Sequence, residues 1–510
     1  MFNPSVQQSG VISWVKTGTG SAFVRAVAGS GKTTTLVHAL AATTGHVAFM
    51  AFNKSAAKDI EKKVAQAIAD GVIPDIRKRV KIGTVHSFGL AAVRRSCPAA
   101  EVDARRKRDI TVEKFRQIDS PQGLDSFVLE LVSLAKQRAI GLFGSIEDKS
   151  EWFDIVDHHD MAGDLEELPG VTVEQGVELA IRTLKFHNEL FRQIKLIDFD
   201  DMIYLPVVTG MTPWQNDWVF GDEWQDANPA RRALVRKMLK PTGRALFVGD
   251  ERQAIYGFAG ADNASIDNSI REFNCATLPL TITYRCPKAV VVEAQRIVSH
   301  IEAAETAPDG SVLSLDYADF IKAIKELRAT DAILCRKTKP LVSLAYKLIR
   351  SGVACHVEGK EIGSGLIKLI NRWRRARDLE QLQARLEDYA EREVQRLMAK
   401  GRETQAEALR DKVDTVLAIM EGASDLNDLR AKISAMFEDA ENLPKMTLTL
   451  STVHKAKGRE WENVYILGRA DFMPSAWARQ AWEQEQEQNL IYVAVTRSQA
   501  MLAYVNGVPA

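Results

Sequence analysis

The stretch Ala28-Gly29-Ser30-Gly31-Lys32-Thr33-Thr34 follows a short apolar run, residues 22–27, and precedes the helix-like residues 36–40. Glycines at these positions let backbone N–H groups approach phosphate oxygens, and the N-terminus of a following helix favours negative charge. A lysine here reaches the β- and γ-phosphates, and the next hydroxyl completes the shell of Mg²⁺. The full pattern has glycine at position 26, where this chain has Ala26. The segment predicts a strand, a phosphate-binding loop and a helix, with Ala28, Gly29, Ser30, Gly31, Lys32, Thr33 and Thr34 holding a nucleotide.

The composition is that of an ordinary globular protein. The chain has 510 residues, of which 46% are hydrophobic and 26% charged, which allows several domains. Its 67 basic and 67 acidic residues balance, so the net charge does not indicate a nucleic-acid partner. The five cysteines are scattered without a CxxC pair, which argues against a disulfide framework and a zinc site. Without a signal peptide or an apolar run near the ~20 residues that span a bilayer, we expect a cytoplasmic protein with no membrane partner.

Strand-like apolar runs alternate with helical stretches over most of the chain, which predicts parallel α/β sheets. The alternation is interrupted twice by helical, polar sequence. We therefore expect a first α/β domain at residues 1–94 and 198–275 with a helical insertion at 95–197. A second α/β domain is expected at 276–369 and 443–510, with a shorter helical block at 370–442.

Two adjacent carboxylates, Asp222 and Glu223, directly follow the strand-like residues 218–220. In a protein with a phosphate loop, this placement predicts that Asp222 holds Mg²⁺ and that Glu223 polarises the attacking water. A further predicted strand, residues 245–248, leads to Gly249-Asp250 and to Gln253, a candidate sensor of the γ-phosphate. Tyr256 and Phe258 follow in the same loop and present aromatic rings.

These three segments resemble consecutive motifs of the UvrD/Rep family of superfamily 1 DNA helicases, and further segments resemble its other motifs in the right order. The resemblance implies two RecA-like motor domains of the P-loop NTPase type with two inserted helical subdomains, the second shorter than usual. It implies ATP and Mg²⁺ as cofactors, and single-stranded DNA and single-strand/duplex junctions as partners. It also implies 3′ to 5′ movement and strand separation, driven by ATP hydrolysis coupled to closure of the two motor domains.

The same resemblance implies roles for individual residues. Gln8 would read the adenine edge, Tyr284 would stack on adenine, Glu460 would lie near the ribose, and Arg285 and Arg497 would contact phosphates. The residues implied to contact DNA are Phe52, Asn53, Lys54, Thr84, His86, Tyr256, Phe258, Thr452 and His454. The chain departs from the family pattern at four further positions: Phe258 stands where Trp is usual, Ala259 where Arg is usual, Trp224 where Phe is usual, and Arg459 where Leu is common.

Two alternatives stay open at this point. The acidic segment Asp198-Phe199-Asp200-Asp201 could in principle hold a metal ion in a helicase-nuclease, although a similar segment recurs in the family where the first insertion rejoins its motor domain. The other alternative is an ATP-dependent switch that binds single-stranded DNA without unwinding.

Overall fold

The computed structural model describes residues 3–118, 124–159, 161–162, 165, 170–255, 264–351, 353–373, 376–399, 403–437, 447–478 and 480–507. The chain divides into two compact units. The first comprises Met1–Ala26 and Gly31–Leu280, and the second comprises Val27–Ser30 and Thr281–Ala510. Each unit contains one six-stranded, all-parallel sheet, so the predicted α/β class with two RecA-like motor domains is confirmed.

The first sheet has the strand order β3-β2-β6-β7-β1-β8. Its strands are β1 (Ala22–Ala26), β2 (Val47–Ala51), β3 (Val80–Thr84), β6 (Asn216–Gly221), β7 (Leu239–Gly249) and β8 (Ala276–Leu280). Every residue of β2 is buried, as expected for a parallel strand that is covered on both faces and therefore reads as a continuous apolar run.

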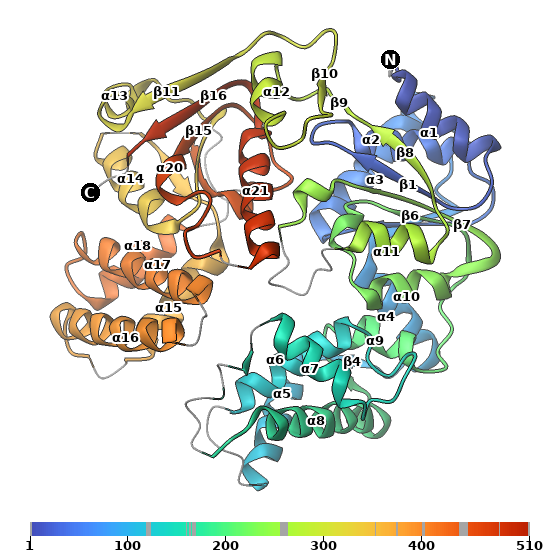
Figure 1. Ribbon diagram of the computed structural model, residues 1–510, viewed down its shortest axis with the longest axis horizontal. Coiled ribbons are helices and arrows are strands. Elements are labelled where there is room, and N and C mark those ends of the chain that lie inside the picture. Colours follow the sequence, from blue (N-terminus) through green and yellow to red (C-terminus); the bar gives the residue numbers. More distant parts are fainter. Residues whose placement is uncertain are drawn as a thin grey trace. The chain divides into compact units, whose positions relative to one another are not determined.

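Helices cover both faces of this sheet (Figure 1). Phe49 of β2 packs in the core formed with α1 (Val6–Thr17), α2 (Lys32–Ala39) and α3 (Lys54–Ala69). The next residue, Met50, packs in the opposite core with α4 (Val85–Ser96), α9 (Asp201–Val208), α10 (Pro229–Met238) and α11 (Ser265–Glu272). The alternation of side chains along the strand thus serves two separate cores.

The first helical insertion builds a core of its own around Phe127, Trp152 and Leu184. Its elements are β4 (Glu101–Val102), α5 (Ala104–Gln117), α6 (Leu124–Gln137), α7 (Lys149–His158), α8 (Val173–Ile194) and β5 (Leu196–Ile197). Figure 1 shows these helices in teal, grouped beside α4 and α9. Met202, Tyr204 and Leu205 of α9 belong to the same core, so α9 links the insertion to the sheet.

The second sheet has the order β11-β16-β15-β12-β14-β13. Its strands are β11 (Ser311–Asp316), β12 (Asp331–Cys335), β13 (Cys355–Val357), β14 (Leu448–Thr452), β15 (Trp461–Leu467) and β16 (Ser498–Asn506). The unit also contains β9 (Ile282–Thr283), β10 (Glu302–Ala303), α12 (Lys288–Ala294), α13 (Tyr317–Lys322), α14 (Thr338–Arg350), α15 (Lys360–Asn371), α19 (Val453–Ala456), α20 (Arg469–Phe472) and α21 (Ala481–Val495).

The second helical block consists of α16 (Leu379–Ala399), α17 (Glu403–Met420) and α18 (Leu426–Met436). Its described residues share a core with the sheet, because Leu386 of α16 and Val416 of α17 pack in one cluster with Leu344 of α14 and Leu450 of β14. Asp411 of α17 also accepts hydrogen bonds from the first backbone N–H groups of α14, Thr338 at 2.8 Å and Lys339 at 2.9 Å. These contacts join the described part of the block to the second sheet and α14.

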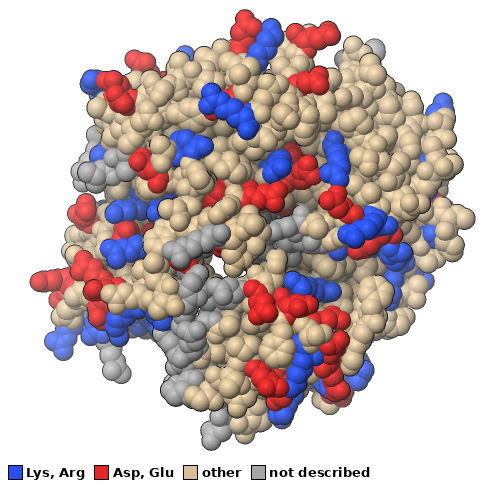
Figure 2. Space-filling view, viewed as in Figure 1, with Lys and Arg blue, Asp and Glu red and all other residues tan. Residues whose placement is uncertain are grey.

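The surface carries charges of both signs. Figure 2 shows basic and acidic side chains interspersed over the face in view, in keeping with the equal numbers of the two kinds. Among the described helices none is long and apolar enough to cross a membrane. The domain boundaries expected above remain predictions.

Candidate nucleotide site and nucleic-acid interface

In the first sheet the strands are parallel, so their C-terminal ends meet at one edge, where ligands of open α/β sheets bind. Residues 27–34 follow β1, and Phe52 and Asn53 follow β2. Thr84 ends β3, Asp222 follows β6, and Asp250 follows β7. The tertiary structure thus brings these separate predicted motifs to one edge.

The phosphate loop depends on two glycines in the left-handed region, Gly29 with φ 72° and Gly31 with φ 77°. Gly31 is the N-cap of α2, and a Cβ atom there would lie 2.8 Å from Nε2 of Gln8. The side chain of Gln8, which is buried in α1, therefore lies against the loop. The capping box of α1 holds it there, since the Ser5 N–H donates to Gln8 Oε1 at 3.0 Å.

Four of the predicted site residues of the first unit, Lys32, Thr33, Asp222 and Glu223, lie close to one another. Thr33 Oγ1 donates a hydrogen bond of 2.7 Å to Asp222 Oδ2, and Lys32 Nζ lies 3.9 Å from Glu223 Oε1. Glu223 has a positive φ of 52°, and its N–H donates to Asp222 Oδ1 at 3.0 Å. A left-handed, non-glycine residue is strained and is typical of functional sites. The two carboxylates are thus held on a backbone turn that the surroundings impose.

Burial and the neighbouring charge of Glu223 raise the pKa of Asp222 to about 6. Burial also raises the pKa of Asp250. A divalent cation would offset both effects, because it favours the ionised carboxylate. The oxygen atoms of Thr33 and Asp222 are the hard donors that Mg²⁺ prefers, so the residues present fit this ion.

Two further residues, Gln225 and Asp250, connect the carboxylate site to Gln253. Gln225 Nε2 donates to Glu223 Oε2 at 2.6 Å, and Gln225 Oε1 accepts from the N–H of Asp250 at 3.1 Å. Gln253 Nε2 in turn donates to Asp250 Oδ2 at 2.6 Å. The sequence predicted a role for Gln253 but did not predict these hydrogen bonds. The only local signal for them was that Gln225 and Asp250 come shortly after two strands.

In the second unit the predicted residues Arg285 and Glu460 form an ion pair, with Arg285 Nε 2.6 Å from Glu460 Oε2. Arg285 Nη1 also donates to the carbonyl of Thr496 at 3.3 Å. Arg497 is fully buried, and its guanidinium donates to the carbonyls of Val493 at 2.8 Å and Arg459 at 3.0 Å. The roles of these groups toward a nucleotide remain predictions.

The loop residues that belong to the second unit have contacts there. The N–H of Ala28 donates to the hydroxyl of Tyr492 at 2.9 Å, and the N–H of Tyr284 donates to the carbonyl of Gly29 at 2.9 Å. Tyr284 leaves 49% of its surface exposed, so its ring is available to a ligand. Tyr492 was not predicted, although it lies within the segment that resembles the last helicase motif.

The residues expected to contact DNA in the first unit lie at strand ends. Asn53 and Thr84 are N-caps: Asn53 Oδ1 accepts from the N–H of Ala56 at 2.8 Å, and Thr84 Oγ1 accepts from the N–H of Ser87 at 3.2 Å. Lys54 is exposed, and Phe52 is half-buried. Burial, with the charge of Arg231, lowers the pKa of His86 to about 4. Tyr256 and Phe258 lie outside the described residues.

In the second unit, Thr452 ends β14 and His454 lies in α19. Thr452 is buried, and burial lowers the pKa of His454 to about 3, assisted by the charges of Arg336 and Lys455. His454 is therefore neutral at pH 7. Contact of either residue with DNA stays a prediction.

Two of the departures from the family pattern have structural partners. Trp224 stacks on Phe247 with ring centroids 4.5 Å apart, and its indole N–H donates to Ser269 Oγ at 3.1 Å, so it is a core residue. Arg459 forms an ion pair with Glu358, which follows β13. Ala259 lies outside the described residues.

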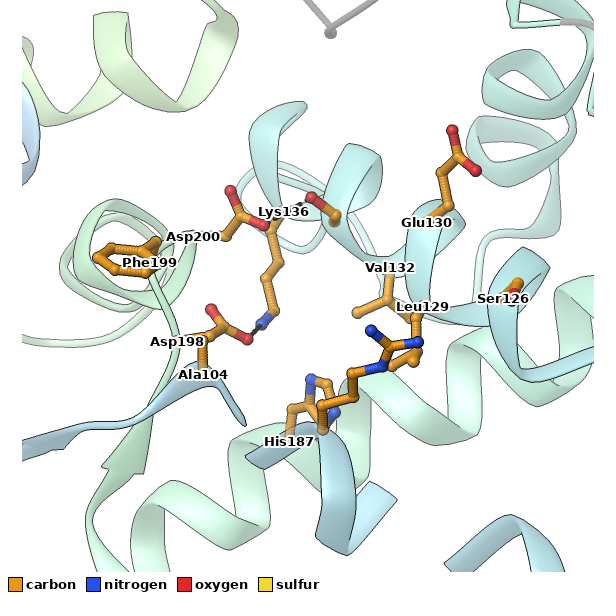
Figure 3. A pocket seen from close by; sticks show the side chains of 12 residues that line it. Ala104, Ser126, Leu129, Glu130, Val132, Lys136, His187, Asp198, Phe199 and Asp200 are labelled. Atoms are coloured by element: carbon orange, nitrogen blue, oxygen red, sulfur yellow. Dashed lines mark hydrogen bonds and ion pairs between the residues drawn. The ribbon is translucent and has the colours of Figure 1, made fainter. Parts of the chain in front are cut away.

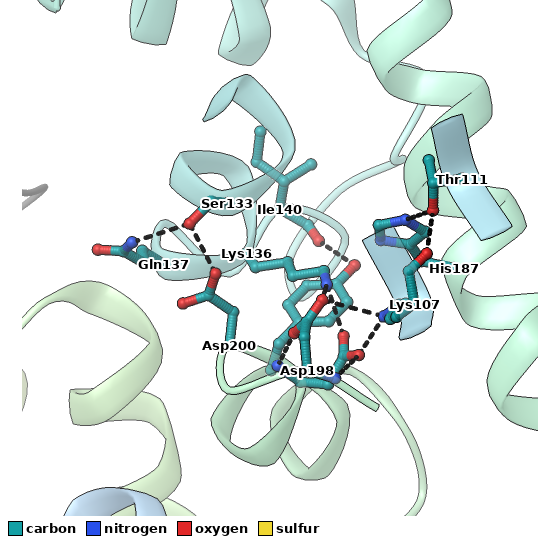
Figure 4. Close-up of polar contacts among 11 residues, drawn as sticks. Lys107, Thr111, Ser133, Lys136, Gln137, Ile140, His187, Asp198 and Asp200 are labelled. Atoms are coloured by element: carbon teal, nitrogen blue, oxygen red, sulfur yellow. Dashed lines mark hydrogen bonds and ion pairs between the residues drawn. The ribbon is translucent and has the colours of Figure 1, made fainter. Parts of the chain in front are cut away.

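In the acidic segment Asp198-Phe199-Asp200-Asp201, Asp198 and Asp201 form ion pairs with lysines of the first helical insertion, and Asp200 accepts a hydrogen bond from Ser133 Oγ at 2.6 Å. An adjacent cavity of about 440 Å³ is lined by Asp198, Asp200, Lys136 and His187, as Figure 3 shows. Lys136 lies 2.6 Å from Asp198 Oδ2 and 2.7 Å from Asp201 Oδ1, and Lys107 pairs with the same two carboxylates (Figure 4). Within the described ranges no group of three or more His, Cys, Asp or Glu side chains could hold a metal ion. The segment therefore gives the helicase-nuclease alternative no support.

Comparison with known proteins identifies the family. Residues 12–274 match the UvrD/REP helicase N-terminal domain, which is more than half of the chain, and residues 447–505 match the UvrD-like helicase C-terminal domain. The ATP-dependent DNA helicase PcrA of Leuconostoc citreum is 24% identical over 311 residues, which cover 56% of this chain and 38% of that protein. PcrA of Staphylococcus aureus strain NCTC 8325 is 26% identical over 318 residues, which cover 58% of this chain and 40% of that protein. The matches thus span about two fifths of the length of these relatives. The family match and the motifs gathered at the edge of the first sheet together show that the chain belongs to the UvrD/REP helicase family.

Proposed function

We propose that this protein is an ATP-dependent DNA helicase that moves 3′ to 5′ on single-stranded DNA and separates duplex DNA. One observation carries the proposal. Thr33 Oγ1 donates to Asp222 and the Glu223 N–H donates to the same carboxylate, at the same sheet edge as Phe52 and Thr84, an arrangement that would suit Mg-ATP hydrolysis beside a bound DNA strand.

In the proposed mechanism Lys32 binds the β- and γ-phosphates, and Thr33 and Asp222 would hold Mg²⁺, which would neutralise charge on the phosphates. Glu223 orients the attacking water, and the hydrogen bond from Gln225 Nε2 keeps its carboxylate in place. Gln253 senses the γ-phosphate and is linked to Glu223 through Asp250 and Gln225.

The remaining nucleotide contacts are assigned by family resemblance. Gln8 and Tyr284 bind adenine, and Glu460 lies near the ribose. Arg285 and Arg497 of the second motor domain bind phosphates, so that ATP favours closure of the two motor domains and hydrolysis releases it. If the domains grip DNA differently in the two states, each cycle moves the protein along the strand.

The DNA contacts are expected to be independent of sequence. The rings of Phe52, Tyr256 and Phe258 stack on bases, which contributes ~1–3 kcal/mol per base with little preference for one base. Asn53, Lys54, Thr84, His86, Thr452 and His454 complete the path. Single-strand/duplex junctions are the substrate on which strand separation begins.

The test is an unwinding assay on duplexes that bear either a 3′ or a 5′ single-stranded tail, run in parallel with ATPase measurements with and without DNA. Unwinding from the 3′ tail alone, abolished in Lys32→Ala, is expected. Unwinding from the 5′ tail alone would contradict the polarity. ATPase stimulation by DNA without any strand separation would support the alternative, an ATP-dependent switch that binds single-stranded DNA.

A further inference from the structure

Arg231 contacts both Phe52, which is proposed to bind DNA, and the turn that follows Glu223 of the proposed ATP site. It lies in the first turn of α10, where its N–H donates to the N-cap Asn228 at 3.0 Å. Its guanidinium carbon lies 5.5 Å from the centroid of the Phe52 ring, and its Nη1 donates to the carbonyl of Asp226 at 2.8 Å. Its Nε is buried and has no hydrogen-bond partner among the residues that the structure describes. Buried donors without a partner are rare in native proteins, so the position calls for an explanation.

The guanidinium borders a cavity of about 150 Å³, which is also lined by His86, Asp200 and Asn228. The cavity gives the side chain room to move. The charges that face it are those of Asp226 and Asp200, together with Lys136 at the cavity wall, which is bound to Asp198 and Asp201. His86 is neutral at pH 7, because burial and the charge of Arg231 lower its pKa to about 4. Arg231 is thus a cation that lies over the ring of Phe52 and lines the same cavity as His86, and both of these residues are proposed to contact DNA.

On its other side Arg231 is joined to the hydrolytic site. Asp226 ends the short helical turn η3 (Trp224–Asp226), which directly follows Glu223. The middle residue of that turn, Gln225, donates to Glu223 Oε2 at 2.6 Å. Glu223 itself is the N-cap of the turn and has the strained φ of 52°. A displacement of Arg231 would therefore move the carbonyl of Asp226, three residues after Glu223. It would also move the turn whose residue Gln225 orients the carboxylate of Glu223.

We propose that Arg231 is a positioning residue that couples a DNA strand at Phe52 and His86 to the carboxylate of Glu223. A base on the Phe52 ring, or a backbone phosphate beside it, changes the surroundings of the guanidinium, and the bond to Asp226 passes that change to η3. This inference rests on the proposed function. It adds the route by which DNA stimulates hydrolysis.

The test measures steady-state ATP hydrolysis of the full chain while oligo(dT) is titrated, for the wild type, Arg231→Gln and Arg231→Lys. Arg236→Gln is the matched control, because Arg236 is another arginine of α10 but lies over Phe273. For Arg231→Gln we expect the ratio of kcat at saturating DNA to kcat without DNA to fall about tenfold, a typical coupling between two sites. The KM for ATP should not change. Arg231→Lys keeps the charge without the planar fork and should restore part of the stimulation. Arg236→Gln should behave as the wild type does.

Three results would overturn the inference. Arg231→Gln could be stimulated as strongly as the wild type. It could need more DNA but reach full stimulation at saturation, which would make Arg231 a binding residue only. It could also lose activity in equal proportion with and without DNA and melt at a lower temperature, which would make the role structural. A wild-type protein that DNA does not stimulate would instead refute the proposed function, and the two failures are therefore distinguishable.

Discussion

Replacing Lys107 by methionine should strongly destabilise the first unit. Lys107 and Lys136 are both 1% exposed, and they face Asp198 and Asp201 in one cluster (Figure 4). The charges of these two lysines balance those of Asp198 and Asp201, and burial raises the pKa of the nearby Asp200. The methionine side chain would preserve most of the length and packing of the lysine but leave one lysine to neutralise two buried carboxylates.

The magnitude follows from the burial. Breaking a buried ion pair by removing one partner costs ~3–5 kcal/mol, because an uncompensated charge stays in the interior. For a domain of about 150–250 residues, each kcal/mol lowers the melting temperature by roughly 2–4 °C. We therefore expect a decrease of roughly 6–20 °C. Scanning calorimetry and urea denaturation of the full chain measure it.

Two further variants make the test selective. Lys107→Met combined with Asp201→Asn removes the excess charge and should recover part of the lost stability. Lys149→Met removes the exposed ion pairs with Glu174 and Glu178 in the same helical insertion and should cost at most ~1 kcal/mol, because exposed pairs contribute little. If Lys107→Met destabilises the protein no more than Lys149→Met does, the reasoning about the buried cluster is refuted.

Three other predictions concern the candidate site. Glu223→Gln should bind ATP but hydrolyse it very slowly, because the proposed metal ligands stay while the group that polarises water is lost. A fluorescent ATP analogue measures the binding, and single-turnover kinetics measure the hydrolysis. Wild-type turnover would refute the assignment. Arg285→Ala should lower kcat by roughly 10³-fold or more with little change in ATP affinity, as for other arginines that contact the transferred phosphoryl group; near-normal kcat would exclude that role. In the folded state the pKa of His86 is about 4, below its ordinary value of 6.5. Between pH 6.5 and about 4 the unfolded chain therefore binds more protons than the folded chain does. The free energy of unfolding should fall as the pH drops through this range. His86→Gln should flatten that part of the stability profile measured by urea denaturation, and an unchanged slope would show that His86 is not responsible.

The local chemistry of the site could be predicted from the sequence. A phosphate loop, a carboxylate pair after a strand and the alternation of strands with helices are short-range patterns, since backbone geometry and side-chain periodicity repeat within a few residues. The structure gives Gly29 and Gly31 positive φ values and places Thr33 beside Asp222, while the roles of these residues toward a nucleotide remain predictions. Tyr256 and Phe258, which were predicted from the same kind of pattern, lie outside the described residues and remain predictions.

The contacts between distant residues were decided by the tertiary structure alone. Lys107 contacts Asp201, 94 residues away in the sequence, Arg285 contacts Glu460, 175 residues away, and Arg231 of α10 lies over the Phe52 ring. These long-range contacts depend on the strand order and on how the helices pack on the sheet. Neither feature leaves a periodic signal in the sequence. For the same reason the sequence indicated a helical block at 370–442 but not its shared core with the second sheet. Apolar spacing tells which face of a helix is buried, whereas the partner that buries it is selected only when the whole chain folds.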